Sequence, residues 1–177
     1  SDGGFDIRMS ETVKIVCAEC LARNRVPAAR LRERPLCGKC QQRLLPGRPI
    51  ELTAANFATF LQKNELPIVV DFWAAWCGPC RRENPNVVRI YNKYHDQGLE
   101  IIGVSLDGQS RQQDPKKAWL DAIEEDNLTW NHVSTLKYFN DPIAKTYNIQ
   151  AIPATYILDS EGKIVDKNLR GSQLELK

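Results

Sequence analysis

The chain has 177 residues and a mass of 20.1 kDa, which is enough for one domain of ordinary size and one small module. Its formal net charge is only +2. No apolar stretch is long enough to cross a membrane and no signal peptide is visible, so membrane-spanning and exported proteins are not favoured classes.

Four cysteines near the N-terminus form two C-x-x-C pairs, and β-like segments over 13–16 and around Val26 accompany the first pair. Sixteen residues separate the pairs, a spacing typical of a structural zinc ribbon in which four thiolates surround one metal ion. Two disulfides, or iron in place of zinc, are the alternatives. We predict a zinc ribbon over 12–46, preceded over 1–11 by a vector-derived remnant or a disordered arm. The predicted zinc ligands are Cys17, Cys20, Cys37 and Cys40.

Charge is distributed unevenly along the chain. The first 50 residues contain 10 basic and 5 acidic residues, whereas the rest contain 14 basic and 17 acidic ones. A basic excess can mark a nucleic-acid surface, but the ribbon has no aromatic residue for stacking on bases. A solvated face that offsets metal-bound thiolates is the simpler interpretation. We therefore expect no nucleic-acid partner, no membrane partner and a reducing, cytoplasmic location.

A second domain is predicted after a stiff Pro- and Gly-containing linker over 46–49. Thr53 can cap its first helix. The apolar run over 68–73 predicts a buried strand, which is followed by a helix over 77–96. Pro85 lies inside that helix, so we expect a kink there.

Helices and strands continue to alternate in the rest of the chain. We expect a strand over 100–106, a helix over 115–125, a strand over 130–133, a short helix over 142–147 that Asp141 caps, and a hairpin over 154–158 and 163–167. The segment between residues 107 and 153 is longer than a simple crossover needs, so it must contain an insertion. This order predicts an α/β sheet in a domain over 50–177.

The most informative motif is Cys77-Gly78-Pro79-Cys80, which follows the buried strand and opens a helix. This layout is typical of a dithiol redox enzyme, and it disfavours a chance C-x-x-C or half of a metal site. The unpaired N–H groups and the dipole of a helix start favour a thiolate, so Cys77 is the predicted nucleophile. Cys80 lies nearly one turn further along and is the predicted resolving thiol.

Several motifs of the second domain resemble those of the thioredoxin superfamily. They are F-W-A-A-W-C-G-P-C over 72–80, Pro85, and I-P-A-T over 152–155 before a hairpin. The ribbon resembles that of the zinc-ribbon bacterial thioredoxins, called thioredoxin 2, whereas the chain from about Arg81 onward is similar to the TlpA/ResA group of exported thiol-disulfide oxidoreductases. The change of resemblance near the active site suggests a natural or engineered recombinant. It implies an α/β thioredoxin-like fold with a central insertion, preceded by a small zinc ribbon.

The resemblance also assigns a substrate surface. Pro153 matches the cis proline beside the dithiol, and Ile152 and Pro153 would offer backbone groups to an extended substrate chain. Trp76, Gly78 and Pro79 would form the rim that receives the substrate.

Two acids match positions that these families use to deprotonate the resolving thiol. Asp71 matches the buried strand aspartate of thioredoxins, and Glu83 matches a glutamate of the TlpA/ResA group. The apolar strand around Asp71 should raise its pKa above the usual value of about 3.9. Glu83 lies three residues after Cys80 and so near the same helix face. Arg81 and Arg82 could steer acidic substrates, but on an exposed helix face we expect them to be solvated.

We predict a monomeric protein disulfide reductase that acts on protein disulfide substrates. An external reductase would supply the electrons, since the sequence has no G-x-G-x-x-G nucleotide loop. An oxidase or isomerase of the TlpA/ResA type is one alternative, because the reduction potential decides the direction. Another is a partner-binding zinc ribbon with a redox switch.

Overall fold

A computed structural model describes residues 12–45 and 51–168 of the chain. The predicted arm over 1–11 and the predicted linker over 46–49 lie outside these residues. In the described residues, no helix combines the length and the apolar character that crossing a lipid bilayer demands.

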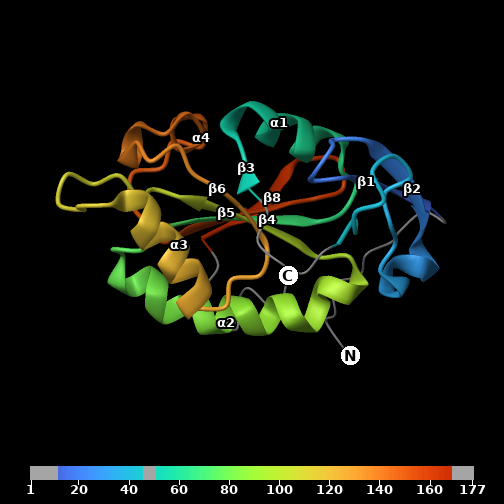
Figure 1. Cartoon of the computed structure of the whole chain (residues 1–177), viewed down its shortest axis with the longest axis horizontal. Coiled ribbons are helices and arrows are strands. Elements are labelled where there is room, and N and C mark those ends of the chain that lie inside the picture. Colours follow the sequence, from blue (N-terminus) through green and yellow to red (C-terminus); the bar gives the residue numbers. More distant parts are fainter. Residues whose placement is uncertain (1–11, 46–50, 169–177) are drawn as a thin grey trace.

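The main domain is built on one six-stranded mixed sheet (Figure 1). In spatial order its strands are β3 (Glu51–Leu52), β6 (Asn131–Val133), β5 (Glu100–Ser105), β4 (Ile68–Trp73), β7 (Ala154–Leu158) and β8 (Ile164–Lys167). The first four run parallel, whereas β7 is antiparallel to β4 and β8 is antiparallel to β7. The predicted α/β sheet is confirmed, and β3 is an edge strand that the sequence did not predict.

Helices cover both faces of the sheet. They are α1 (Ala54–Lys63), α2 (Gly78–Tyr94), α3 (Pro115–Glu125) and α4 (Pro142–Thr146). Three short 3-10 segments are also present: η1 (Ala28–Glu33) in the N-terminal module, and η2 (His95–Gln97) and η3 (Tyr138–Asn140) in the main domain. Figure 1 shows α1 and α4 on one side of the sheet and α2 and α3 on the other. The sheet core is therefore closed from both sides.

Local capping chemistry sets where the helices begin. The Thr53 hydroxyl accepts a hydrogen bond from the amide of Asn56 at 3.3 Å, as predicted for the start of α1. The Asp141 carboxylate accepts one from Ile143 at 2.8 Å, which caps α4. The helix predicted over 115–125 is α3 without a change of bounds. Helix α2 continues through Pro85, the position of the predicted kink.

The two central strands are buried along their whole length, which explains why most of their residues are apolar. In β4, Val70 and Phe72 pack into the core beneath α1 and α4. Val69 and Trp73 point to the other face and join the core beneath α2 and α3. Because side chains alternate along a strand, β4 contributes side chains to both cores and so fixes the position of the start of α2 relative to them.

The N-terminal module is a two-stranded antiparallel sheet of β1 (Thr12–Val16) and β2 (Arg23–Pro27), and it packs on the main domain. Val16 belongs to the main core, whereas Leu66 from the main domain belongs to the core of the module. The amide of Glu65 donates to the carbonyl of Lys14 at 2.9 Å, and their side chains form an ion pair at 3.1 Å. The module and the sheet therefore share buried apolar contacts.

Candidate active site and metal centre

The dithiol lies where β4 gives way to α2. Cys77 is the N-cap of α2 and forms a disulfide with Cys80, so the structure is the oxidised form. The amide of Cys80 donates a hydrogen bond to Cys77 Sγ at 3.2 Å. Gly78 and Pro79 are exposed between two buried cysteines, so the segment that links the two cysteines faces solvent.

The predicted substrate surface surrounds the disulfide. The bond between Ile152 and Pro153 is cis, as the resemblance implied, and Cys77 Sγ lies 3.8 Å from the Ile152 carbonyl oxygen. Trp76 is half-buried, and its indole N–H donates to the Leu106 carbonyl at 3.3 Å. Its ring centre lies 5.6 Å from that of Tyr138, so the rim of the site includes an aromatic residue that the sequence did not point to.

A tight contact between two loops supports that rim. Gly108 follows β5 with a φ of +111°, and a Cβ there would lie 2.1 Å from the carbonyl oxygen of Leu136. Only glycine fits such an approach at this backbone angle. The two loops line a hollow of about 600 Å³, and Tyr138, which packs against Trp76, is one of its lining residues.

The two predicted acids differ in burial. Asp71 lies within β4 and is 5% exposed, and burial followed by the charge of Glu83 raises its pKa to about 7. Glu83 lies half-buried on α2, and its carboxylate accepts a hydrogen bond from Asn86 at 3.0 Å. The prediction that burial raises the Asp71 pKa is confirmed, and the two carboxylates interact electrostatically.

Asp107 is a site residue that the sequence reading missed. It is fully buried at the end of β5, and both carboxylate oxygens accept the amide hydrogen of Ala75, each at 3.2 Å. Gln112 donates a further bond to it at 2.6 Å. An acid directly after a buried parallel strand was the available signal, because such strand ends gather at functional edges of α/β sheets.

The expectation that Arg81 is solvated was wrong, whereas Arg82 is exposed as expected. The Arg81 guanidinium forms ion pairs with Asp126 at 2.6 Å and with Glu125 at 2.8 Å. It also donates to the Ala75 carbonyl at 3.2 Å. Its acidic partners are more than 40 residues away along the chain, so the local sequence could not reveal them.

The four ribbon cysteines converge. Their sulfur atoms all lie within 4.8 Å of one another, and the pairs Cys17 with Cys40 and Cys20 with Cys37 are each 3.6 Å apart. Thiolates bound at about 2.3 Å around one tetrahedral zinc ion would be about 3.8 Å apart. All four thiols are free, so the structure does not support the disulfide alternative. The donor set fits one tetrahedral metal ion.

The two halves of the cluster are built alike. The amides of Leu21 and Gln41 donate to the carbonyls of Cys17 and Cys37, each at 2.9 Å, and both donors have positive φ. Asn24 donates to Cys37 Sγ at 3.5 Å, a contact that holds the sulfur in place. Two equal turns thus present four sulfurs to a common centre.

Comparison with known proteins agrees with this architecture. The model of the AhpC/TSA family matches residues 50–167. The chain belongs to this family. A second model, for the N-terminal domain of thioredoxin 2, matches residues 16–42, which contain the four ribbon cysteines. The AhpC/TSA domain and the ribbon therefore account for nearly all the described residues.

Curated relatives of both predicted kinds are found. Thioredoxin C-3 of Corynebacterium nephridii is 49% identical over 76 residues, which cover 43% of this chain and 52% of that protein. The thiol-disulfide oxidoreductase ResA of Oceanobacillus iheyensis is 35% identical over 97 residues, which cover 55% of this chain and 46% of that protein. The chain thus spans about half the length of these curated relatives.

Solved structures show the same fold. A thiol-disulfide oxidoreductase from Bacteroides fragilis superimposes with a TM-score of 0.56 at 28% identity, over 64% of this chain and 79% of that one. The thioredoxin domain of a thiol-disulfide oxidoreductase from Bacteroides vulgatus gives a TM-score of 0.55 at 38% identity, over 65% and 76% of the two chains. The thioredoxin-like fold of the AhpC/TSA domain is thereby confirmed.

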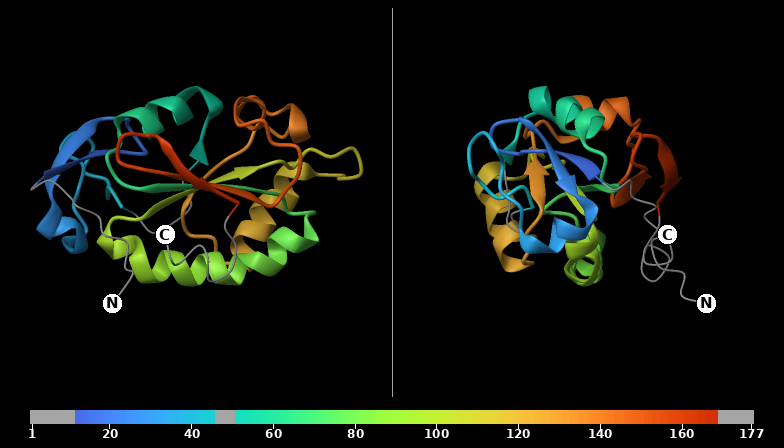
Figure 2. Two further views of the ribbon diagram at one scale, coloured as in Figure 1. Left: turned by 180° about the vertical axis from the view of Figure 1, so that it is seen from behind. Right: turned by 90° about the vertical axis from the view of Figure 1, so that its right-hand side faces the viewer.

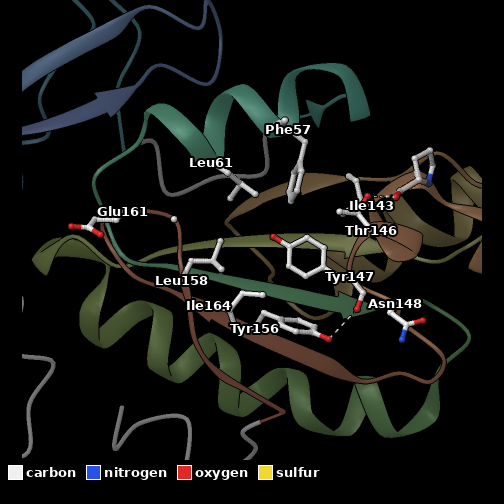
Figure 3. Close-up of a pocket in the computed structure, with 13 residues that line it drawn as sticks. Phe57, Leu61, Ile143, Thr146, Tyr147, Asn148, Tyr156, Leu158, Glu161 and Ile164 are labelled. Carbon is white, nitrogen blue, oxygen red and sulfur yellow. Dashed lines mark hydrogen bonds between the residues drawn. The ribbon is translucent and has the colours of Figure 1, made fainter.

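An apolar pocket of about 630 Å³ lies on the opposite side of the sheet from α2 (Figure 3). Phe57 and Leu61 of α1 face Tyr147 and Tyr156 across it, and the Tyr156 hydroxyl donates to the Tyr147 carbonyl at 3.1 Å. Its lining includes no residue of the dithiol, the cis proline or the rim. The pocket is therefore separate from the redox site.

Proposed function

We propose that this protein is a thiol-disulfide oxidoreductase that reduces disulfides in other proteins. The observation that carries the proposal is the Cys77–Cys80 disulfide at the start of α2, which lies against the carbonyl of the cis Ile152–Pro153 bond and opens to solvent at Gly78 and Pro79. The relatives named thiol-disulfide oxidoreductase and thioredoxin support the same chemistry.

The reaction starts from the reduced dithiol. The Cys77 thiolate attacks one sulfur of a substrate disulfide, the substrate S–S bond breaks, and its other sulfur leaves as a thiolate. The Cys80 thiolate then attacks Cys77, which releases the second substrate sulfur and forms the Cys77–Cys80 disulfide. Two electrons pass to the substrate, and the enzyme dithiol becomes oxidised.

Local electrostatics suits these two steps. The Cys80 amide, which donates to Cys77 Sγ, would stabilise the attacking thiolate together with the helix dipole. We assign the proton of Cys80 to Asp71, whose pKa of about 7 lets the carboxylate accept a proton near neutral pH. Glu83 supports this role, because its negative charge raises the pKa of Asp71.

Substrate, electron donor and location complete the proposal. Trp76, Gly78, Pro79, Ile152 and Pro153 would bind an extended substrate segment beside the dithiol. An external reductase would return the electrons, and the Gly-Pro pair between the cysteines resembles that of reducing members. The ribbon cysteines are spaced for a metal and not for disulfides, and for this reason we propose a reducing compartment such as the cytoplasm. We propose that the protein acts as a monomer.

We also assign one structural zinc ion to the ribbon. The four convergent sulfurs and the match to the thioredoxin 2 N-terminal domain support zinc, which prefers a closed tetrahedral thiolate site. The ribbon contacts the main domain near η2, which follows the far end of α2. Figure 2 shows the ribbon at the end of the sheet remote from the start of α2. The metal would therefore stabilise the fold and take no part in the redox step.

Two variants test the proposal. We expect Cys77→Ser to abolish insulin reduction, and Cys80→Ser to attack once and stall as a mixed disulfide that non-reducing electrophoresis detects. Mixed disulfides that accumulate with Cys77→Ser instead would reverse the assignment. A reduction potential close to that of strong oxidants such as DsbA, near about −120 mV, would favour the oxidase alternative.

A further inference from the structure

Both polar backbone groups of Ala75 are held by charged side chains. Its amide donates to the Asp107 carboxylate, at 3.2 Å to each oxygen. Its carbonyl accepts from Arg81 Nη1 at 3.2 Å. Ala75 lies two residues before Cys77 in the loop that joins β4 to α2. The peptide units on both sides of Ala75 are therefore fixed, one by Asp107 and the other by Arg81.

Each of these side chains is fixed in turn. Asp107 is fully buried, and it accepts hydrogen bonds from the Ser105 hydroxyl and from Gln112. Arg81 is half-buried and is gripped by Asp126 through two nitrogen atoms, at 2.6 and 3.2 Å. Such a two-point contact sets the plane of a guanidinium group as well as its position.

The partners of Arg81 come from the central insertion. Asp126 follows the last residue of α3, and it also accepts a hydrogen bond from Asn84 of α2 at 2.7 Å. Figure 1 shows α3 lying against the first part of α2. The insertion therefore reaches the dithiol loop through a chain of contacts from Asp126 to Arg81 to Ala75.

We propose that Arg81, Asp107 and Asp126 are positioning residues for the redox reaction. They hold the loop so that the Cys77 sulfur stays at the helix start, where the Cys80 amide donates to it. Loss of the grip would let the sulfur move away from that donor, so the thiolate would be less stabilised and would attack more slowly. The proposal rests on the proposed disulfide exchange at Cys77.

A purely electrostatic role for these residues predicts a different sign. Replacing Asp126 by Asn removes a negative charge near the dithiol, and by charge alone it should lower the Cys77 pKa. If Asp126 acts by gripping Arg81, the same change frees the arginine, loosens Ala75 and raises the Cys77 pKa. The direction of change for Asp126→Asn therefore separates the two explanations.

The charged and titratable groups at the dithiol site and at the contacts of Ala75 must be kept constant in this comparison. They are Asp71 on β4, Cys80, Arg81 and Glu83 on α2, Asp107 after β5, Glu125 and Asp126 at the end of α3, and Tyr138 beside Trp76. Apart from Arg81 and Asp126, these groups are left unchanged by the variants chosen below. Arg82 on α2 and Glu124 on α3 are exposed and serve as control positions.

The test measures the alkylation rate of Cys77 by iodoacetamide across pH in the reduced, full-length protein, with the modified peptide quantified by mass spectrometry. We expect Arg81→Gln and Asp126→Asn each to raise the apparent Cys77 pKa and to slow alkylation near neutral pH by about three- to tenfold. Arg81→Lys retains the charge but not the two-point contact, so it should slow the reaction as well. The controls Arg82→Gln and Glu124→Gln make the same charge changes at exposed neighbours and should leave the rate within about twofold.

Faster or unchanged alkylation in Asp126→Asn would overturn the proposal, as would an Arg82→Gln effect equal to that of Arg81→Gln. Thermal unfolding shows whether each variant keeps its fold, and Asp126→Asn is nearly isosteric with the parent residue. If Arg81→Gln fails to fold, the alkylation rates of Asp126→Asn and Arg81→Lys still test the proposal. Alkylation requires no substrate. If the parent protein fails to reduce insulin while these variants change the Cys77 pKa as expected, the proposed function fails and the positioning role stands.

Discussion

Glu100 is a buried acid that the redox reaction does not use, and it gives a quantitative prediction. It opens β5 at 4% exposure, and burial raises its pKa from an ordinary 4.5 to about 8. The side chain of His95 lies close to it, with Nδ1 at 3.6 Å from Glu100 Oε1. Burial lowers the pKa of His95, so near neutral pH both side chains are uncharged in the folded protein.

The sign of the pH effect follows from these values. The unfolded chain releases the Glu100 proton above pH 4.5, while the folded protein retains it up to about pH 8. Stability contributed by Glu100 is therefore complete below pH 4.5 and is lost as pH rises toward 8. One pKa unit corresponds to about 1.4 kcal/mol, so the loss by neutral pH is about 3 kcal/mol.

Glu100→Gln should remove this loss. Guanidinium unfolding of the parent and the variant at about pH 5 and about pH 8 would measure the difference in unfolding free energy. We expect that difference to shift by about 3 kcal/mol in favour of the variant at the higher pH. Comparing the parent–variant difference at the two pH values removes any effect of the glutamine that does not depend on pH. It also removes the pH-dependent contribution of Asp71, which is the same in both proteins. The exposed substitution Glu124→Gln serves as the control. A difference that stays constant with pH would show that Glu100 is ionised in the fold and would refute the reasoning.

Three further predictions concern the metal, the acids and the glycines. Cys17→Ser should release one zinc per chain and lower the unfolding midpoint, which elemental analysis and thermal unfolding would show; metal-free parent protein would contradict this. In stopped-flow reduction, the rate of mixed-disulfide release by the parent should rise with pH through about 7, and Asp71→Asn should flatten this pH dependence. Glu83→Gln should reduce the pH dependence less, and the effects of the two substitutions should not add in the double variant. Gly108→Ala should lower the free energy of unfolding by about 3 kcal/mol, because the new Cβ would clash with Leu136 and the backbone angle would also be strained. Gly162→Ala should lower it by only about 1 kcal/mol, because only the backbone angle would be strained there. Equal losses in chemical unfolding would show that the Gly108 contact does not matter.

Periodic and capping signals predicted most of the fold. The apolar run of β4, the Asp-Pro pair that starts α4 and the hairpin of β7 and β8 depend on residues close in sequence, so local physics determines them. The dithiol and the four-cysteine cluster could also be predicted, because fixed spacings identify them, and the cis proline was implied by the resemblance of the I-P-A-T motif to that of the thioredoxin superfamily. Strand β3 has only two residues, too few to show any alternation.

The features that the sequence did not predict depend on distant partners. Arg81 looks like any exposed helix arginine until α3 brings Asp126 against it. Asp107 has a role only because the loop before α2 presents an unpaired amide to it. Glu100 looks like a charged residue at the exposed start of a strand, but it is buried and lies near His95. Each of these features depends on a contact between residues that are distant in the sequence, and a local sequence pattern carries no information about such contacts.

The interleaved packing of Val16 and Leu66 limits how this protein can be dissected or recombined. A truncation that starts after the ribbon would leave a hole beneath α1 and expose Leu66 to water, so lost activity could reflect aggregation. If the ribbon binds zinc as proposed, chelating that ion from the intact chain is the cleaner way to isolate what the ribbon contributes. A transplant of the ribbon onto another thioredoxin-like scaffold would have to include the segment around Glu65 and Leu66, because these residues of the main domain are part of the core and the contacts of the ribbon.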